Sequence, residues 1–185
     1  RGYPVSRRND PWMVEGVVGA RVGVAAGICL GDPDCSAVTR IERAPEVHRV
    51  SQLLESGIVV DPRTWTVFNS QNTAFIRELA PAMMMWPGVG RYDDIFASLV
   101  AQRVMRDRGL HVHFGRPFVY QQRNAHDLVK DLKGELMGME HIVKFAEWLD
   151  GLDFISSANT VLDAVHCVFA EMARVDWLRS LGTRF

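Results

Sequence analysis

The sequence predicts an α/β fold, in which strands alternate with helices along the chain. Three stretches carry this prediction. Residues 95–108 repeat apolar side chains at helical spacing and lead to Gly109, a common residue just after a helix end. Residues 110–114 alternate in polarity, as a half-buried strand does. Residues 127–149 return to helical spacing and read as one or two helices.

The elements before residue 95 are shorter, and turn residues separate them. In chain order, we expect a turn-rich segment at 1–15, a Gly- and Val-rich stretch at 17–30, a turn at 31–34, a helix at 45–57, strands at 58–60 and 64–68, and a loop that becomes a short helix at 72–85. The glycines of the second stretch lack the G-x-G-x-x-G spacing, so no dinucleotide fingerprint is supported.

The C-terminal part begins with another short strand, at residues 118–120. Asn159 is expected to cap the last helix. The apolar face of that helix comprises Val161, Leu162, Val165, Phe169, Met172 and Ala173. We therefore expect one domain at residues 1–150 and a helical C-terminal extension at residues 151–185.

The composition is that of an ordinary globular chain, with 185 residues, of which 48% are hydrophobic and 23% charged. A formal net charge of -1 argues against a nucleic-acid partner, because no basic surplus exists to neutralise phosphates. No apolar run reaches the ~18 residues of a membrane span, so no membrane partner is expected. Three cysteines, at positions 29, 35 and 167, form no disulfide framework, which favours a cytoplasmic location.

The block GRYDD at residues 90–94 is the most informative stretch, because it places a cation, an aromatic ring and two carboxylates at a helix start. Such an arrangement suits a sugar and a phosphate. Asp93 is the expected N-cap, and Asp94 falls in the first turn, where the helix dipole favours a charged carboxylate. Arg91 offers paired donors to a diphosphate, and Tyr92 offers an apolar face to a sugar ring. The alternatives are a surface cation and a packed ring.

Several blocks accompany GRYDD in one order. They are RGYPVSRR at 1–8, GICLGDPD at 27–34, NTAF at 72–75 with REL at 77–79 and PAM at 81–83, and PFVY at 117–120. The series resembles the reversibly glycosylated polypeptides, also known as UDP-arabinopyranose mutases. This resemblance implies a GT-A-like glycosyltransferase fold, of which residues 1–150 are the C-terminal part, a mixed sheet flanked by helices. It also implies a divalent metal, Mn²⁺ or Mg²⁺, whose ligands lie mainly upstream of this chain.

The resemblance also implies roles for single residues. Arg1 falls on the arginine that becomes glycosylated, and Arg8 falls on the second arginine of that motif, a substrate-binding position. An arginine is a poor nucleophile because its guanidinium stays protonated, so a carboxylate must receive a proton. Asp93 and Asp94 are the candidates. Asn72 falls on a position suited to binding sugar hydroxyls, although an Asx-type turn is an equal reading.

Some residues depart from the family pattern or lie outside it. Gln121 stands where the family has a His, and Ser36 replaces a family Asp. A neutral amide is a weaker metal ligand than an imidazole. His111 and His113 share one face of a predicted strand, but the sequence offers no third ligand beside them. No metal ligand is therefore assigned within the chain.

The leading hypothesis is a UDP-sugar enzyme that interconverts pyranose and furanose forms, with a glycosyl-arginine as candidate intermediate. One alternative is a glycosyltransferase that moves the sugar to a separate acceptor. A second alternative is a non-catalytic partner of an active relative, which Gln121 favours. The expected partner is a nucleotide-sugar substrate, and homo- or hetero-oligomers are left open.

Overall fold

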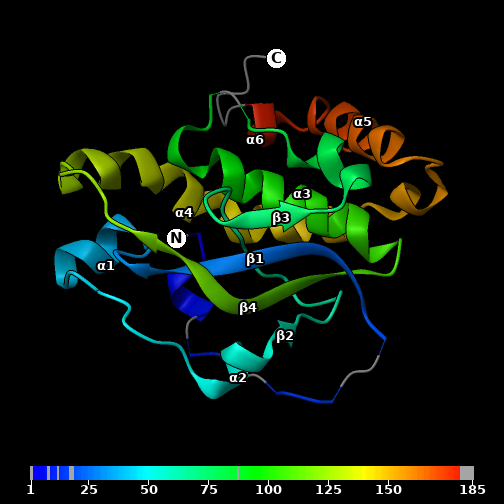
Figure 1. The fold of residues 1–185 in the computed structure, drawn as a ribbon. Coiled ribbons are helices and arrows are strands. Elements are labelled where there is room, and N and C mark those ends of the chain that lie inside the picture. Colours follow the sequence, from blue (N-terminus) through cyan, green and yellow to red (C-terminus); the bar gives the residue numbers. More distant parts are fainter. Residues whose placement is uncertain (1, 8, 12, 17–18, 87, 180–185) are drawn as a thin grey trace.

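A computed structural model describes residues 2–7, 9–11, 13–16, 19–86 and 88–179. It has a four-stranded mixed sheet in the order β2-β4-β1-β3. The strands are β1 (Arg21–Gly31), β2 (Ile58–Val59), β3 (Thr73–Phe75) and β4 (Leu110–Gln121). Helices flank this sheet, with α3 (Asp93–Arg106) and α4 (Leu128–Asp150) on one side of it and α5 (Val161–Met172) beyond them (Figure 1). The predicted α/β class is confirmed at this level.

The long strands β1 and β4 form the centre of the sheet. They run parallel, whereas β3 pairs with β1 and β2 pairs with β4 in the antiparallel sense. Two separate strands were expected at 110–114 and 118–120, but β4 is continuous across both. The register shifts between Gly27 and Cys29 of β1, opposite the segment of β4 that contains Pro117. This irregularity admits the proline without ending the strand.

Helix α3 is the centre of the core. All its residues from Asp94 to Met105 are buried. Among them are the apolar residues of the predicted helical repeat, Ile95, Phe96, Leu99, Val100 and Val104. Its polar side chains hold the segment that we expected to form a strand at 64–68. Gln102 accepts a hydrogen bond from the Thr66 amide at 3.0 Å and donates one to the Thr66 carbonyl at 2.6 Å. The strand prediction was wrong because these bonds go to a helix side chain instead of a neighbouring strand.

The remaining elements are short apart from α4. They are η1 (Val5–Arg7), α1 (Ala37–Glu42), α2 (Gln52–Ser56), η2 (Arg77–Met83), η3 (Gly90–Tyr92), η4 (Asp153–Ser157) and α6 (Asp176–Arg179). The helix expected at 45–57 is therefore limited to α2, which Gly57 ends with a φ of 91°. Upstream of α2, Val47 forms an isolated bridge with Gly31 instead of a helical turn. The short helix expected within 72–85 is the 3₁₀ helix η2.

The caps of the two C-terminal helices explain where they begin. The Asp127 side chain accepts hydrogen bonds from the amides of Val129 and Lys130 and starts α4, which is one helix. Thr160 caps α5 in a capping box with Asp163, so the expected cap, Asn159, was one residue too early. Among the described residues, no helix combines the length and the apolarity that crossing a membrane requires.

Candidate active site

The parallel strands β1 and β4 end side by side, with Gly31 paired to Gln121. The chain then turns into α1 from one strand and into α4 from the other. In open α/β sheets, ligands bind outside the carboxyl ends of parallel strands, because loops and helix starts gather there. The candidate site therefore lies at this edge of the sheet.

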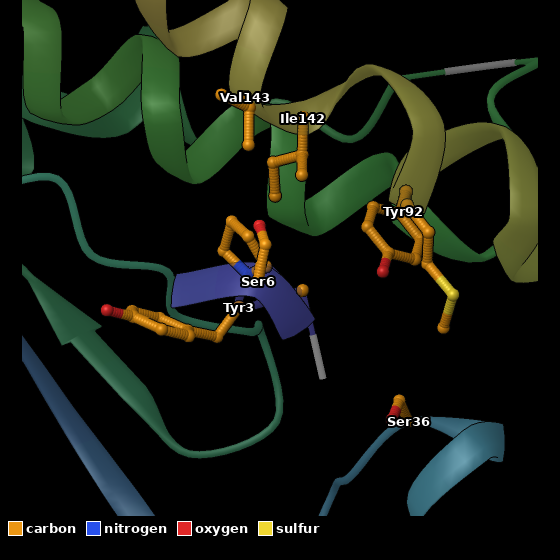
Figure 2. Close-up of a pocket in the computed structure, with 9 residues that line it drawn as sticks. Tyr3, Ser6, Ser36, Tyr92, Ile142 and Val143 are labelled. Atoms are coloured by element: carbon orange, nitrogen blue, oxygen red, sulfur yellow. The ribbon is translucent and has the colours of Figure 1, made fainter. Parts of the chain in front are cut away.

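A cavity of ≈ 240 Å³ lies beside this edge. Its walls come from four parts of the chain, the N-terminal segment, the start of α1, the residue before α3 and the middle of α4. The lining residues are Gly2, Tyr3, Pro4, Ser6, Ser36, Tyr92, Met139, Ile142 and Val143. In Figure 2, Ile142 and Val143 point from α4 toward the segment that carries Ser6, while Tyr92 and Ser36 come from other sides. The volume is below the ~300–1,000 Å³ of drug-sized sites, so it suits a group as small as one sugar ring.

The N-terminal wall depends on Gly2. Its φ is +86°, a value that favours glycine, and an added Cβ would lie 2.7 Å from Cγ2 of Ile95. This contact packs the start of the chain against the first turn of α3. The short helix η1 follows, with the Arg7 amide bonded to the Pro4 carbonyl at 3.1 Å. The glycine of the RGYP block is thus required by close packing.

Tyr92 is the residue of the GRYDD block that reaches the cavity. Its side chain is only 2% exposed, and its ring lies against α4 where Gly138 leaves room. A Cβ at Gly138 would lie 2.1 Å from the ring. Since one surface of the ring is used in this packing, the expected stacking face for a sugar is at least partly occupied by the protein itself.

The paired carboxylates differ from what we expected. Asp93 is not the N-cap, because η3 already forms a helical turn before it and Asp93 itself has helical angles, φ -56° and ψ -50°. Its Oδ1 accepts a hydrogen bond from the Asp94 amide at 2.8 Å. Asp94 does fall in the first turn and is 6% exposed. Its Oδ2 accepts from the amide and the hydroxyl of Ser70, at 3.1 and 3.4 Å. Neither residue is among those that line the cavity.

Arg91 is held by two carboxylates of α4. Its Nη1 lies 3.2 Å from Asp131, and its Nε lies 3.3 Å from Glu135. Its side chain is 27% exposed. Some of the guanidinium N–H groups that we expected to bind a diphosphate are therefore already paired with carboxylates of the protein.

Asn72 directly precedes β3, lies beside β1 and is not among the residues that line the cavity. Its carbonyl accepts from the Gly27 amide at 2.7 Å, and its Nδ2 donates to the Ile28 carbonyl at 3.5 Å. A Cβ at Gly27 would lie 2.2 Å from Nδ2, so the strand admits Asn72 only beside a glycine. The remaining predicted residues, Arg1 and Arg8, lie outside the described part of the chain.

The acidic turn after β1 is neutralised by arginines. Asp32 pairs with Arg40 at 2.5 Å. Asp34 accepts from Arg123 at 3.0 Å through Oδ1 and from Asn69 at 3.0 Å through Oδ2. The described residues contain no group of three or more His, Cys, Asp or Glu side chains placed to hold a metal ion.

Two buried polar atoms at this edge have no hydrogen-bond partner among the described residues, Oε1 of Gln121 and Nε of Arg123. Gln121 is the last residue of β4, and Arg123 follows it two positions later.

Burial raises the pKa of the nearby Cys35 thiol, against the opposing effect of Arg40. Burial likewise raises the pKa of Cys29, and Asp34 adds to that shift. Both thiols are therefore poor nucleophiles at neutral pH.

The α4 side of the site was not predicted from the sequence. Glu135 accepts a hydrogen bond from Arg91, Gly138 lies against the Tyr92 ring, and Met139 lines the cavity. The available signal was a pair of glycines four residues apart, Gly134 and Gly138, in an otherwise helical stretch, since glycine in a helix interior costs stability unless close packing needs it. That spacing placed both glycines on one face of α4.

Known proteins resemble this chain over most of its length. A family profile described as "Reversibly glycosylated polypeptide" matches residues 1–179. A protein of Solanum tuberosum called "Probable UDP-arabinopyranose mutase 2" is 31% identical over 156 residues, which cover 80% of this chain and 39% of that protein. "UDP-arabinopyranose mutase 1" of Arabidopsis thaliana is 31% identical over 154 residues, or 78% of this chain and 40% of the relative.

The relative from Oryza sativa subsp. japonica, "UDP-arabinopyranose mutase 1", is likewise 31% identical, over 78% of this chain and 39% of its own length. The chain thus spans about two fifths of the length of these relatives. The family match covers nearly the whole chain, including every residue that lines the cavity. The chain belongs to the reversibly glycosylated polypeptide family.

Proposed function

We propose that this chain forms the sugar-handling part of a UDP-sugar mutase, which interconverts the pyranose and furanose forms of the sugar. One observation carries the proposal. Gly2, Tyr3 and Pro4 of the first sequence block and Tyr92 of the GRYDD block, about ninety positions apart in the sequence, line the same cavity. The relatives with matching sequences are called UDP-arabinopyranose mutases.

The proposed chemistry begins with attack by a guanidinium nitrogen of Arg1 on the anomeric carbon. The new C–N bond replaces the C–O bond to the diphosphate, whose electron pair departs with UDP. The nitrogen loses one proton, which a carboxylate receives. Asp94 is the first candidate for that acceptor and Asp93 the second. In support, Gly2, which follows Arg1 in the sequence, packs against Ile95, which follows Asp94.

While the sugar stays attached to the arginine, the bond between the anomeric carbon and the pyranose ring oxygen O5 breaks and the O4 hydroxyl adds to the anomeric carbon. O5 receives the proton that O4 loses, so no atoms are gained or lost. Return of UDP to the anomeric carbon breaks the C–N bond and restores the proton to the guanidinium. In this proposal Arg8, Arg91 and Asn72 bind the substrate, and the substrate must displace or share the partners that Arg91 and Asn72 have within the protein.

We further propose a GT-A-like fold for the complete sugar-nucleotide domain, with residues 151–185 as a helical extension. A divalent metal would then neutralise the departing diphosphate. The carboxylates near the end of β1 do not fit that ion on their own, because Asp32 and Asp34 are already paired with arginines. The metal ligands are therefore proposed to come mainly from sequence outside these 185 residues.

A mass measurement tests the arginine chemistry. The complete protein, incubated with UDP-arabinopyranose and Mn²⁺, is expected to gain the mass of one sugar, because the C–N bond is covalent. Excess UDP should reverse the gain. Peptide mapping should locate the sugar on the peptide that contains Arg1. A sugar found elsewhere would contradict the role of Arg1, and an unmodified protein with a glycosylated acceptor would support a glycosyltransferase instead.

Titration calorimetry tests the placement of the donor site. The 185-residue chain alone is expected to show no micromolar binding of UDP with Mn²⁺, since its acidic turn is neutralised and Gln121 offers only an amide oxygen. The complete protein is the positive control. Micromolar binding by the chain alone would mean that it holds a complete donor site.

A further inference from the structure

Glu135 is a fully buried carboxylate behind the cavity, on a turn of α4 that the sequence analysis left without a role. Its side chain is 0% exposed. Oε2 accepts a hydrogen bond from the Ala37 amide at 2.9 Å. Oε1 accepts from Nε of Arg91 at 3.3 Å. Both oxygens are therefore used, and by parts of the chain that are far apart in sequence.

Each of these bonds fixes a neighbour of a cavity residue. Ala37 is the first residue of α1 and directly follows Ser36, which lines the cavity. Arg91 directly precedes Tyr92, which lines it from another side. One turn further along α4 lies Met139, which lines the cavity from α4. A single carboxylate on α4 is thus bonded to the neighbours of two cavity residues that come from other walls.

Packing alone does not explain a charged side chain at this position. A buried ion pair is often no more stabilising than apolar residues of similar volume, because both charges lose their hydration. A bonded carboxylate fixes the direction and the distance to both partners, whereas an aliphatic side chain does not. Its effect is therefore expected in the geometry of the cavity more than in overall stability.

We propose that Glu135 is a positioning residue that sets the separation of Ser36 and Tyr92 across the cavity. The inference rests on the proposed function in one respect, since it takes this cavity as the place where the sugar is held. Misplacement of a reacting group by about 1 Å can cost about a hundredfold in rate. Loss of this anchor should therefore lower turnover more than it weakens the binding of the nucleotide.

The test uses two variants of the complete protein. Glu135→Gln keeps the shape and one acceptor oxygen, and Glu135→Ala removes both acceptors. Glu140→Gln is the matched control, because Glu140 lies on the same helix and is exposed. We expect kcat for the sugar interconversion to fall by about tenfold or more in Glu135→Ala and by less in Glu135→Gln. The inhibition constant of UDP should change by less than kcat, since Arg91, the proposed diphosphate contact beside Glu135, keeps its ion pair with Asp131.

A second readout does not depend on mutase activity. Cys35 precedes Ser36 and is partly buried, so its rate of alkylation by iodoacetamide reports on the start of α1. Peptide mass spectrometry should show about tenfold faster alkylation of Cys35 in Glu135→Ala, because the α1 start opens more often. Cys167 on α5 is the internal reference and should not change.

The outcomes separate the two proposals. An unchanged Cys35 rate in Glu135→Ala overturns the inference, whatever the activity. A faster Cys35 rate with unchanged kcat also overturns it, because the fixed geometry would then have no bearing on turnover. If the wild-type protein forms no furanose product, the proposed function fails, and the Cys35 rates still decide whether Glu135 holds the start of α1.

Discussion

Gly138→Ala is expected to destabilise the protein by about 1–3 kcal/mol, the usual range for overpacking a core. The added Cβ would lie 2.1 Å from ring atoms of Tyr92, which is 2% exposed, so the ring or the helix must shift. The higher helix propensity of alanine returns about 1 kcal/mol at most. Urea denaturation monitored by circular dichroism measures the change in the free energy of unfolding.

Gly134→Ala is the matched control, one turn earlier on the same helix. Its Cβ would meet only Cδ of Arg91 at 3.1 Å and Cγ at 3.4 Å, and this flexible side chain can shift. We expect a change in the free energy of unfolding within about 1 kcal/mol. Equal destabilisation by both variants would contradict the argument from the Tyr92 ring. Combining Gly138→Ala with Tyr92→Leu should remove most of the penalty, because the ring is then gone.

Much of the fold could be predicted where local pattern and tertiary structure agree. The α3 segment carries a helical repeat and a terminal glycine, and the helix forms within two residues of the prediction. β4 was divided in two because Gly115 and Pro117 interrupt its alternation, and only its pairing with β1 shows that the strand continues. The strand expected at 64–68 failed for a tertiary reason, since Gln102 supplies the hydrogen bonds from α3.

The site was predictable only in part, since Tyr92 alone among the described candidate residues lines the cavity. The first block and Tyr92 do meet at one cavity. The cap at Asp93 was predicted wrongly because the turn before it, η3, is set by packing against α4. Glu135 could not be found from local sequence, since its partners lie 44 and 98 positions away. Such pairs depend on how the elements pack, which neither periodicity nor spacing encodes.

The assignment of Asp94 as proton acceptor gives the largest expected effect on activity. Asp94→Asn should lower turnover by about 10²–10⁴-fold, the usual contribution of a general base. Its stability should change by less than about 1 kcal/mol, because the amide oxygen of Asn can still accept from the Ser70 amide. Asp94→Ala, by contrast, leaves that amide without its acceptor and should cost about 1–3 kcal/mol.

Asp93→Asn separates the two carboxylates, because it makes the same chemical change one residue earlier. The Asp93 side chain accepts from the Asp94 amide within its own turn, whereas Asp94 is 6% exposed and reaches the separate loop at Ser70. A buried, fixed carboxylate is the better preorganised acceptor. We therefore expect Asp93→Asn to keep at least about a tenth of the wild-type turnover, when product formation from UDP-arabinopyranose is followed by chromatography. If Asp93→Asn lowers turnover more than Asp94→Asn does, Asp93 is the proton acceptor instead. Full activity in both variants would mean that both carboxylates are structural.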